Sequence, residues 1–131
     1  MLSWDEERHA LGVAEMDVTH REFAALAAQL AQAATADFPN LFDTLAEHTR
    51  RHFDNESALM RRCRFPAIAE HEGEHSRVLG DLDRLRRGME EGRLSFARAY
   101  VMQGLPEWFT NHLATMDAAL AACLKHSTPK A

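Results

Sequence analysis

The sequence predicts an all-α protein, an up-down-up-down antiparallel four-helix bundle with an extended N-terminal arm. Apolar residues recur every three or four positions through four long segments, and short clusters containing proline or glycine separate these segments. No segment shows the strict alternation of a half-buried strand. Short connections place neighbouring helices antiparallel. With 131 residues, the chain is expected to form a single domain over 1–131 with its own core.

The beginning of the chain divides into an arm and two helices. Residues 1–16 carry scattered apolar groups without helical periodicity, so we expect an extended arm laid across the bundle. The first helix is expected over about 18–36, with Asp17 as its N-cap. The cluster around Pro39 then ends that helix and starts a second one over about 39–64, because proline is tolerated in a first helical turn.

The third helix is expected over about 66–89. Pro66 disfavours helical backbone at the residue before it, which places a corner between the second and third helices. Gly88 and Gly92 indicate the end of the helix and the following turn.

The fourth helix is expected over about 94–124, followed by a polar, frayed tail from Lys125. Gly104 and Pro106 fall inside this segment. Since proline removes a helical donor, they predict a kink or an offset start of the helix there.

Composition excludes several classes of protein. The net charge is −5 with acidic and basic residues interspersed, so no basic face is expected for nucleic acid or anionic lipid. No apolar run approaches the length of a membrane span, and no export signal is visible, so a cytoplasmic protein without membrane insertion is expected. Cys63 and Cys123 are far apart in sequence, which favours two reduced thiols over a disulfide framework or a thiolate metal site.

Ionisable residues lie on the apolar stripes of the predicted helices. His52 and Glu56 are four residues apart, as are His71 and His75. Residues four apart differ by about 40° around a helix axis, so each pair shares a face. Ionisable groups on a buried face are costly unless they are paired or bound to a metal.

His112 and Asp117 are five residues apart, which corresponds to about 140° around a helix. We therefore expect Asp117 to reach a metal from the flank, as suits a carboxylate that bridges two ions. His20 lies near the start of the first helix, at the level where antiparallel packing brings the other pairs. The predicted metal ligands are His20, His52, Glu56, His71, His75, His112 and Asp117. One transition-metal ion needs three or four ligands, so seven suit two ions with shared carboxylates. The remaining histidines, His9, His48 and His126, are expected not to be ligands, with an outer role open for His48.

Two other kinds of metal site match part of this pattern. His71-Glu72-Gly73-Glu74-His75 matches the HExxH helix of zinc proteases. That interpretation leaves the other five candidate ligands unexplained, and a compact bundle lacks a peptide cleft. Ferritin-like di-iron oxidases use mainly carboxylates. Five histidines to two carboxylates instead favour reversible two-electron chemistry over oxidation.

The same residues resemble the hemerythrin family, specifically the bacterial hemerythrins, over essentially the whole chain. The matching motifs are Asp17-Val18-Thr19-His20, His52-Phe53-Asp54-Asn55-Glu56, His71-x3-His75, and Trp108-Phe109-Thr110-Asn111-His112 followed by Asp117.

The resemblance implies a non-heme di-iron centre with an oxo or hydroxo bridge and O2 as its ligand. Glu56 and Asp117 would bridge the two iron ions. His71, His75 and His112 would complete one iron, while His20 and His52 would hold the other and leave one position open. The implied function is reversible O2 binding for carriage, storage or delivery, rather than catalysis. The alternatives are oxygen or redox sensing, scavenging, or an enzyme acting on peroxide or nitric oxide at the same centre.

The resemblance also gives Trp108 and Phe109 as residues lining the O2 pocket. The family commonly has an aliphatic residue where this chain has Phe109, so oxygen kinetics are expected to depend on that ring. Ser57 stands where a second glutamate is frequent, which leaves the ligand set unchanged. A monomer is expected, and the sequence does not identify a protein recipient of O2.

Overall fold

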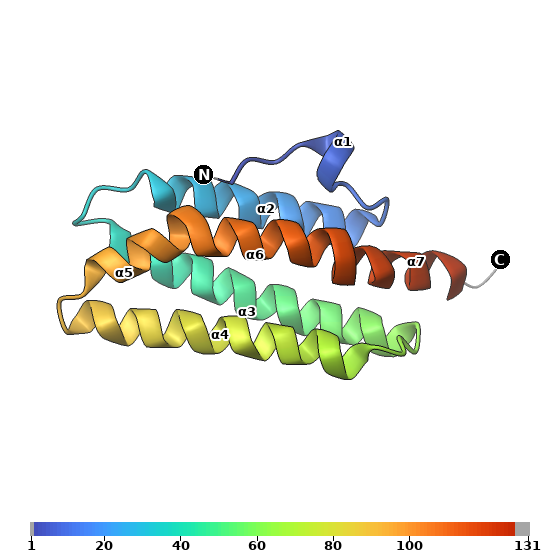
Figure 1. The fold of residues 1–131 in the computed structure, drawn as a ribbon. Coiled ribbons are helices and arrows are strands. Elements are labelled where there is room, and N and C mark those ends of the chain that lie inside the picture. Colours follow the sequence, from blue (N-terminus) through green and yellow to red (C-terminus); the bar gives the residue numbers. More distant parts are fainter. Residues whose placement is uncertain (1, 128–131) are drawn as a thin grey trace.

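The computed structural model describes residues 2–127, and within them the chain forms helices and turns without a strand. Four long helical rods lie side by side, with neighbours in sequence antiparallel (Figure 1). The first three rods are α2 (Ala14–Ala31), α3 (Phe38–Arg62) and α4 (Ile68–Glu90). The fourth rod comprises α5 (Leu94–Ala99), the π-helical turn η1 (Tyr100–Gly104), α6 (Leu105–His112), the π-helical turn η2 (Leu113–Asp117) and α7 (Ala118–Ser127). The all-α class is therefore confirmed.

The N-terminal arm is not fully extended, because it contains a fifth, short helix. This helix, α1 (Glu6–His9), begins where the Asp5 carboxylate accepts a hydrogen bond from the Glu7 backbone N–H at 3.0 Å. The Asp5 N–H in turn donates to Nδ1 of His9 at 2.9 Å. Capping by nearby side chains can form a single turn that shows no helical periodicity in the sequence. The arm runs along α2 and the fourth rod (Figure 1).

The first long helix begins earlier than predicted, so Asp17 is not its N-cap. Helix α2 starts at Ala14 and places Asp17 in its first turn. There the Asp17 carboxylate accepts hydrogen bonds from the backbone N–H groups of Leu11 at 2.7 Å and Gly12 at 3.1 Å. Asp17 therefore holds the preceding turn, in which Gly12 has a φ of 79°.

Helix α2 also ends at Ala31 rather than near residue 36. The Arg98 guanidinium from the fourth rod donates to the Ala33 carbonyl at 2.9 Å and lies over the Phe38 ring at 4.7 Å. A side chain from another helix thus satisfies a carbonyl just beyond the end of α2. The helix propensities of residues 32–36 carry no information about a contact with a side chain from another helix.

The corner between α3 and α4 is a Schellman motif. The Phe65 N–H donates to the Met60 carbonyl at 2.9 Å, and the Arg64 N–H donates to the Arg61 carbonyl at 3.2 Å. Arg64 has a φ of 55°, the left-handed conformation that glycine usually supplies. The motif ends α3 at Arg62 and delays α4 to Ile68, where the sequence predicted 64 and 66.

Replacing Arg64 by glycine should stabilise the protein by about 0.5–1 kcal/mol, because glycine adopts positive φ without the Cβ strain. Chemical denaturation of the metal-loaded protein would measure the change. Arg61→Gly is the matched control, since Arg61 is an exposed residue inside α3, and it should destabilise by about 1 kcal/mol. A loss of stability in Arg64→Gly would show that the Arg64 side chain contributes more than its backbone strain costs.

The fourth rod contains the irregularity predicted near Gly104 and Pro106, in the form of a π-helical turn. The Leu105 N–H donates to the Tyr100 carbonyl, five residues back. Because Pro106 has no N–H, the wider turn leading to it accommodates the missing donor. The rod continues as α7 to Ser127, beyond the predicted 124, and residues 128–131 of the predicted tail lie outside the described residues.

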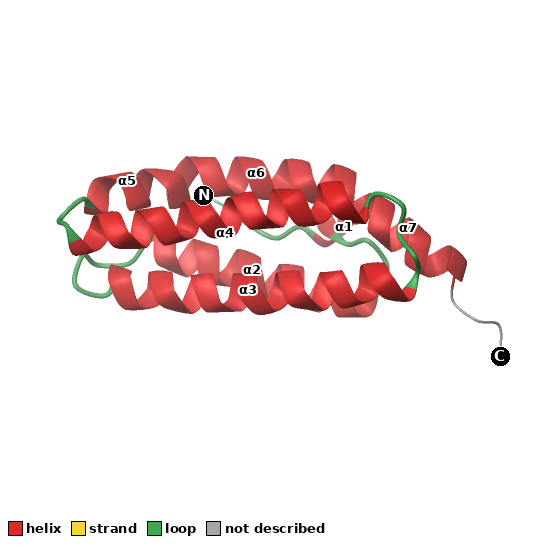
Figure 2. Ribbon diagram, turned by 90° about the horizontal axis from the view of Figure 1, so that it is seen from below, coloured by secondary structure: helices red, strands yellow, loops and turns green. Residues whose placement is uncertain are grey.

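The loops gather at the two ends of the bundle (Figure 2). Two apolar clusters fill the interior between these ends. The larger cluster joins all four rods and includes Phe23, Phe42, Phe53, Val78, Phe109 and Leu113. The smaller cluster contains Met16, Leu59, Met60, Cys63, Phe65, Leu120, Ala121 and Leu124. In residues 2–127, none of the helices has the length and apolar character that crossing a membrane requires.

Candidate metal centre

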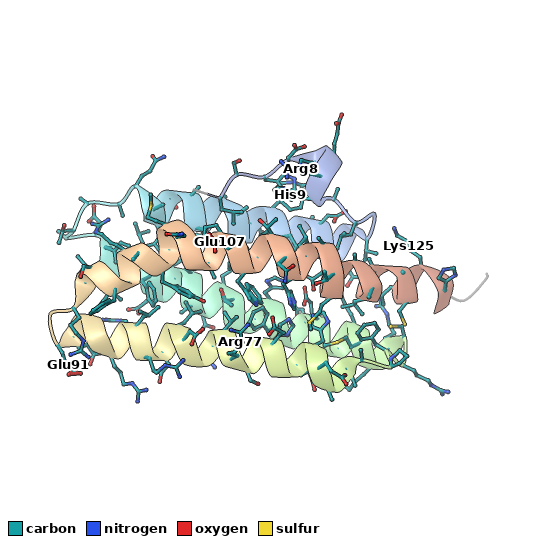
Figure 3. The ribbon with its side chains drawn as sticks, in the orientation of Figure 1. Arg8, His9, Arg77, Glu91, Glu107 and Lys125 are labelled. Atoms are coloured by element: carbon teal, nitrogen blue, oxygen red, sulfur yellow. The ribbon has the colours of Figure 1, made fainter. Side chains whose placement is uncertain are left out.

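Seven ionisable side chains lie between the large and small apolar clusters, and each is at most 4% exposed. They are the residues that the sequence predicted as ligands: His20, His52, Glu56, His71, His75, His112 and Asp117. Each rod changes from apolar to ionisable and back along its buried face. On α3, for example, Glu56 stands between Phe53 of the large cluster and Met60 of the small one. Figure 3 shows nitrogen and oxygen atoms gathered inside the bundle near the Arg77 label.

Glu56 is the point at which four imidazoles meet. Its Oε2 lies 2.7 Å from Nε2 of His52 and 3.1 Å from Nε2 of His20. Its Oε1 lies 3.2 Å from Nε2 of His71 and 3.1 Å from Nε2 of His75. The two oxygens of one carboxylate therefore face two different pairs of histidines.

Asp117 repeats this arrangement from the opposite rod. Its Oδ2 lies 3.2 Å from Nε2 of His20. Its Oδ1 lies 3.2 Å from Nε2 of His71 and 3.3 Å from Nε2 of His112. Although these contacts are short, neither Asp117 oxygen makes a well-aligned hydrogen bond with a described residue. The donor atoms therefore point past one another toward shared positions, as ligands of a common ion do.

The structure corrects the predicted approach of Asp117 from the flank. His112 ends α6, and η2 follows directly, with the Ala118 N–H bonded to the Leu113 carbonyl five residues back. Such a turn is wider than an α-helical turn, so residues five apart come close to one face. His112 and Asp117 consequently both point into the centre. The sequence gap of five is accommodated by the backbone and not by a reach of the side chain.

The three histidines on one side of the centre approach each other through their ring nitrogens. Nε2 of His112 lies 3.2 Å from Nε2 of His71 and 3.3 Å from Nε2 of His75. Two neutral imidazoles that present lone pairs to each other repel, so a shared proton or a cation must lie between them. Two overlapping groups have ligand atoms within 4.8 Å of one another. One is Glu56, His71, His75, His112 and Asp117, and the other is His20, His52 and Glu56. The cluster could therefore hold metal, and its nitrogen and carboxylate donors suit a transition metal.

In the metal-free protein, the site is strongly polarised. Burial opposes protonation of His20 and His71, but the adjacent Asp117 and Glu56 carboxylates outweigh it and raise the pKa of each imidazole to about 9. Burial likewise opposes ionisation of Glu56 and Asp117, yet the surrounding imidazoles hold the pKa of both carboxyl groups well below its usual range. Two buried anions are thus available to neutralise a bound cation.

Glu74 is a member of this region that the sequence analysis did not identify. Its Oε1 accepts a hydrogen bond from the Trp108 indole at 2.9 Å and lies 4.0 Å from Nδ1 of His112. Burial raises the pKa of Glu74, but hydrogen bonds from Trp108 and Arg77 outweigh this effect and lower it. An outer carboxylate commonly orients a metal-binding histidine. The sequence gave no signal for Glu74, because even the competing HExxH pattern leaves its position unspecified and names Glu72 instead.

The two predicted pocket residues lie on different sides of the centre. Phe109 is buried; its ring meets His20 in a T-shaped contact with the centroids 5.7 Å apart, and it stacks on Phe23 with the centroids 4.8 Å apart. Trp108 instead stacks on His112 at 4.6 Å, on the side with three histidines. Only Phe109 is therefore placed to line a position beside His20 and His52.

A surface groove of about 420 Å³ between α2 and α3 leads to the side with two histidines. Its lining includes Thr19, His52, Asn55 and Glu56, but none of the three histidines on the other side. Small molecules can therefore approach the centre from the side of His52.

Three histidines expected not to be ligands lie outside the two groups of candidate ligands: His9, His48 and His126. Among them, His48 contacts Glu22 at 3.3 Å and lies one turn from His52.

The sequence and the fold of this chain both resemble those of known proteins. The chain matches the family described as Hemerythrin HHE cation binding domain over residues 11–124. It is 35% identical to Bacteriohemerythrin of Ralstonia nicotianae, over 100% of this chain and 94% of that protein. The fold is similar to that of a hemerythrin leucine-to-alanine variant, with a TM-score of 0.82 and 20% identity over 95% of this chain and 97% of that chain. A solved leucine-to-phenylalanine variant matches with the same TM-score and coverage at 21% identity.

Proposed function

Because this chain belongs to the hemerythrin family, we propose that it binds O2 reversibly at a non-heme di-iron centre, for oxygen carriage, storage or delivery. One observation carries the proposal. Glu56 and Asp117 each turn their two oxygens toward different groups of histidines, which is the arrangement expected of carboxylates that bridge two ions.

The proposed ligand assignment follows these contacts. His71, His75 and His112 would hold one iron, His20 and His52 would hold the other, and Glu56 and Asp117 would bridge them. The second iron would then have one protein ligand fewer, which leaves room for O2 beside His20. When bound, the iron pair would supply the two electrons that reversible O2 binding requires.

The chain's own residues would shield this position from water on the side of the large apolar cluster, away from the groove. Phe109 and Phe23 stack on each other and meet the histidine rings edge-on, Phe109 against His20 and Phe23 against His52, with the Phe23 and His52 ring centroids 6.2 Å apart. Apolar rings at this place exclude water, which would otherwise promote loss of bound oxygen as peroxide. On the other side, Glu74 and Trp108 would fix the orientation of His112.

The direct test is oxygen binding by the reduced, iron-loaded protein. We expect about two irons per chain by metal analysis, and one O2 taken up per iron pair and released under vacuum over repeated cycles. Visible absorption that appears with O2 and vanishes on its removal would follow the reaction. Stoichiometric zinc in place of iron, or irreversible oxidation at the first exposure to air, would contradict the proposal.

Replacing Phe109 by leucine should alter O2 association or dissociation rates by about 10-fold, since a smaller side chain opens the space beside His20. Iron content should be unchanged, and the cost in stability should be about 1 kcal/mol. Stopped-flow absorbance after mixing with O2 would measure the rates. Phe42→Leu is a matched control, because Phe42 is fully buried in the same large cluster and makes no ring contact with a candidate ligand. If Phe109→Leu changed the O2 association and dissociation rates no more than Phe42→Leu does, Phe109 would not line the O2 pocket.

A further inference from the structure

The two cysteines, 60 residues apart in sequence, meet at the end of the bundle where α3 stops. Cys63 is the C-cap of α3, and Cys123 lies in α7. The Cys123 Sγ donates to the Cys63 backbone carbonyl at 3.3 Å. Both side chains belong to the small apolar cluster or pack directly against it. Figure 3 shows sulfur atoms between the helices at the end of the bundle that carries the Lys125 label.

The two thiols differ in accessibility. Cys63 is 8% exposed, whereas Cys123 is only half-buried, and both are free thiols. Burial and the neighbouring Cys123 thiol raise the pKa of Cys63 to about 11. Cys63 is therefore protonated at neutral pH and shielded from solvent, so an oxidant from solvent meets Cys123 first.

The contacts of the two cysteines favour a covalent bond, because the Cys123 thiol touches the Cys63 backbone and interacts with the Cys63 thiol. A disulfide requires Cα atoms about 4.4–6.8 Å apart. Since the Cys123 sulfur is already in contact with the backbone of Cys63, we expect rotation of the two side chains to bring the sulfur atoms together. The Cys63 thiol donates only a long hydrogen bond of 3.8 Å to the Met60 carbonyl, which little restrains that rotation.

We propose that Cys63 and Cys123 form an intramolecular disulfide when the protein meets hydrogen peroxide. The Cys123 thiolate attacks one peroxide oxygen and breaks the O–O bond, which gives a sulfenic acid and hydroxide; the hydroxide takes up the proton that the thiol released, to form water. The Cys63 sulfur then attacks the Cys123 sulfur, the S–O bond breaks, and the departing hydroxyl takes the Cys63 thiol proton to form a second water. In sum, two thiols and one peroxide become one disulfide and two waters.

This bond would join the two rods that carry the central carboxylates. Cys63 lies seven residues after Glu56 on one rod, and Cys123 lies six after Asp117 on the other. Between the cysteines and the carboxylates pack Met60 and Leu120, both fully buried. Oxidation would therefore link the end of α3 covalently to α7, one layer of side chains away from the centre. It would also close a long loop, which lowers the conformational entropy of the unfolded chain and stabilises the fold.

The test treats the full, iron-loaded chain with hydrogen peroxide and then blocks the remaining thiols with an alkylating agent under denaturing conditions. We expect two thiols per chain to disappear, the intact mass to fall by about 2 Da, and a peptide pair linking Cys63 to Cys123 to appear. Dithiothreitol should restore both thiols. The oxidised protein should also unfold at a higher temperature than the reduced one.

Two variants separate the pair from ordinary oxidation. In Cys63→Ser, Cys123 has no partner and should gain one or more oxygens, and peroxide should not raise the unfolding temperature. In Cys123→Ser, Cys63 should remain a thiol under the same treatment. The proposal is overturned if wild-type protein keeps both thiols, accumulates oxygen on Cys123 without a link, or forms only disulfides between chains. It does not depend on the oxygen chemistry proposed for the centre, because added peroxide is the oxidant.

Discussion

Replacing Glu56 by glutamine is expected to weaken iron binding by more than about 100-fold and to abolish reversible O2 binding. Changes in groups that merely orient ligands cost about 10–100-fold, and Glu56 contacts histidines of both groups. Glutamine preserves the shape of the side chain but removes the charge that would neutralise the cations. Its amide nitrogen would also point a donor toward one group of imidazoles. Iron per chain after desalting, and O2 uptake by the reduced protein, measure the effect.

Glu47→Gln serves as the control for this substitution. Glu47 is an exposed residue of the same helix, with only a loose contact to Arg51 at 3.7 Å. The control should retain both irons and O2 binding, since an exposed ion pair contributes little. Normal iron content in Glu56→Gln would show that Glu56 is not a shared ligand, and would leave the bridging role to Asp117 alone.

The candidate ligands could be predicted from the sequence because they obey the periodicity of the helices that carry them. His52 and Glu56, like His71 and His75, occupy apolar stripes at a spacing of four, and this spacing alone places each pair on one buried face. Antiparallel packing of four helices then brings distant stripes to one level. The structure brings all of these side chains together with at most 4% exposure.

The orientation of Asp117 toward the centre could not be predicted, because it depends on a π-helical turn. Regular α-helical geometry separates His112 from Asp117 by about 140°, whereas η2 turns both toward the centre. Residues within η2 have no composition that marks a π turn in advance. The five-residue spacing showed that a regular α-helix would not place His112 and Asp117 on one face. It did not reveal whether the side chain or the backbone would compensate for this separation.

Helix ends and the thiol pair were missed for a different reason, since both depend on contacts between distant segments. Arg98 reaches the chain beyond α2 from 65 residues away, and Cys123 reaches Cys63 across 60 residues. A sequence pattern reports what a residue prefers locally, while these contacts are set by the register of packed helices. Such contacts therefore follow from the three-dimensional structure and not from local sequence preference.

The metal-free protein should lose stability as the pH rises from 6.5 to 8.5, whereas metal binding should strengthen over the same range. His20 and His71 have a pKa of about 9 in the folded protein, above the ordinary value of 6.5. A group that holds its proton more tightly when folded stabilises the fold fully below its unfolded pKa, and this contribution disappears as the pH passes the folded pKa. Glu56 and Asp117 have lowered pKa values, so they remain ionised in the folded and the unfolded protein throughout this range. They therefore do not contribute to the change of stability with pH.

Unfolding of chelator-treated protein in urea at the two pH values would measure this loss, which we expect to be about 2–4 kcal/mol for the two imidazoles together. His20→Gln should reduce the slope to about half, because one of the two groups is removed. Iron ions require deprotonated imidazoles, so they compete with protons for the same nitrogen atoms and bind more tightly as the pH rises. The stability difference between iron-loaded and metal-free protein should consequently widen toward pH 8.5. If metal-free protein instead became more stable with rising pH, its carboxylates would not be holding protonated histidines, and the arrangement of charges inferred for the centre would be wrong.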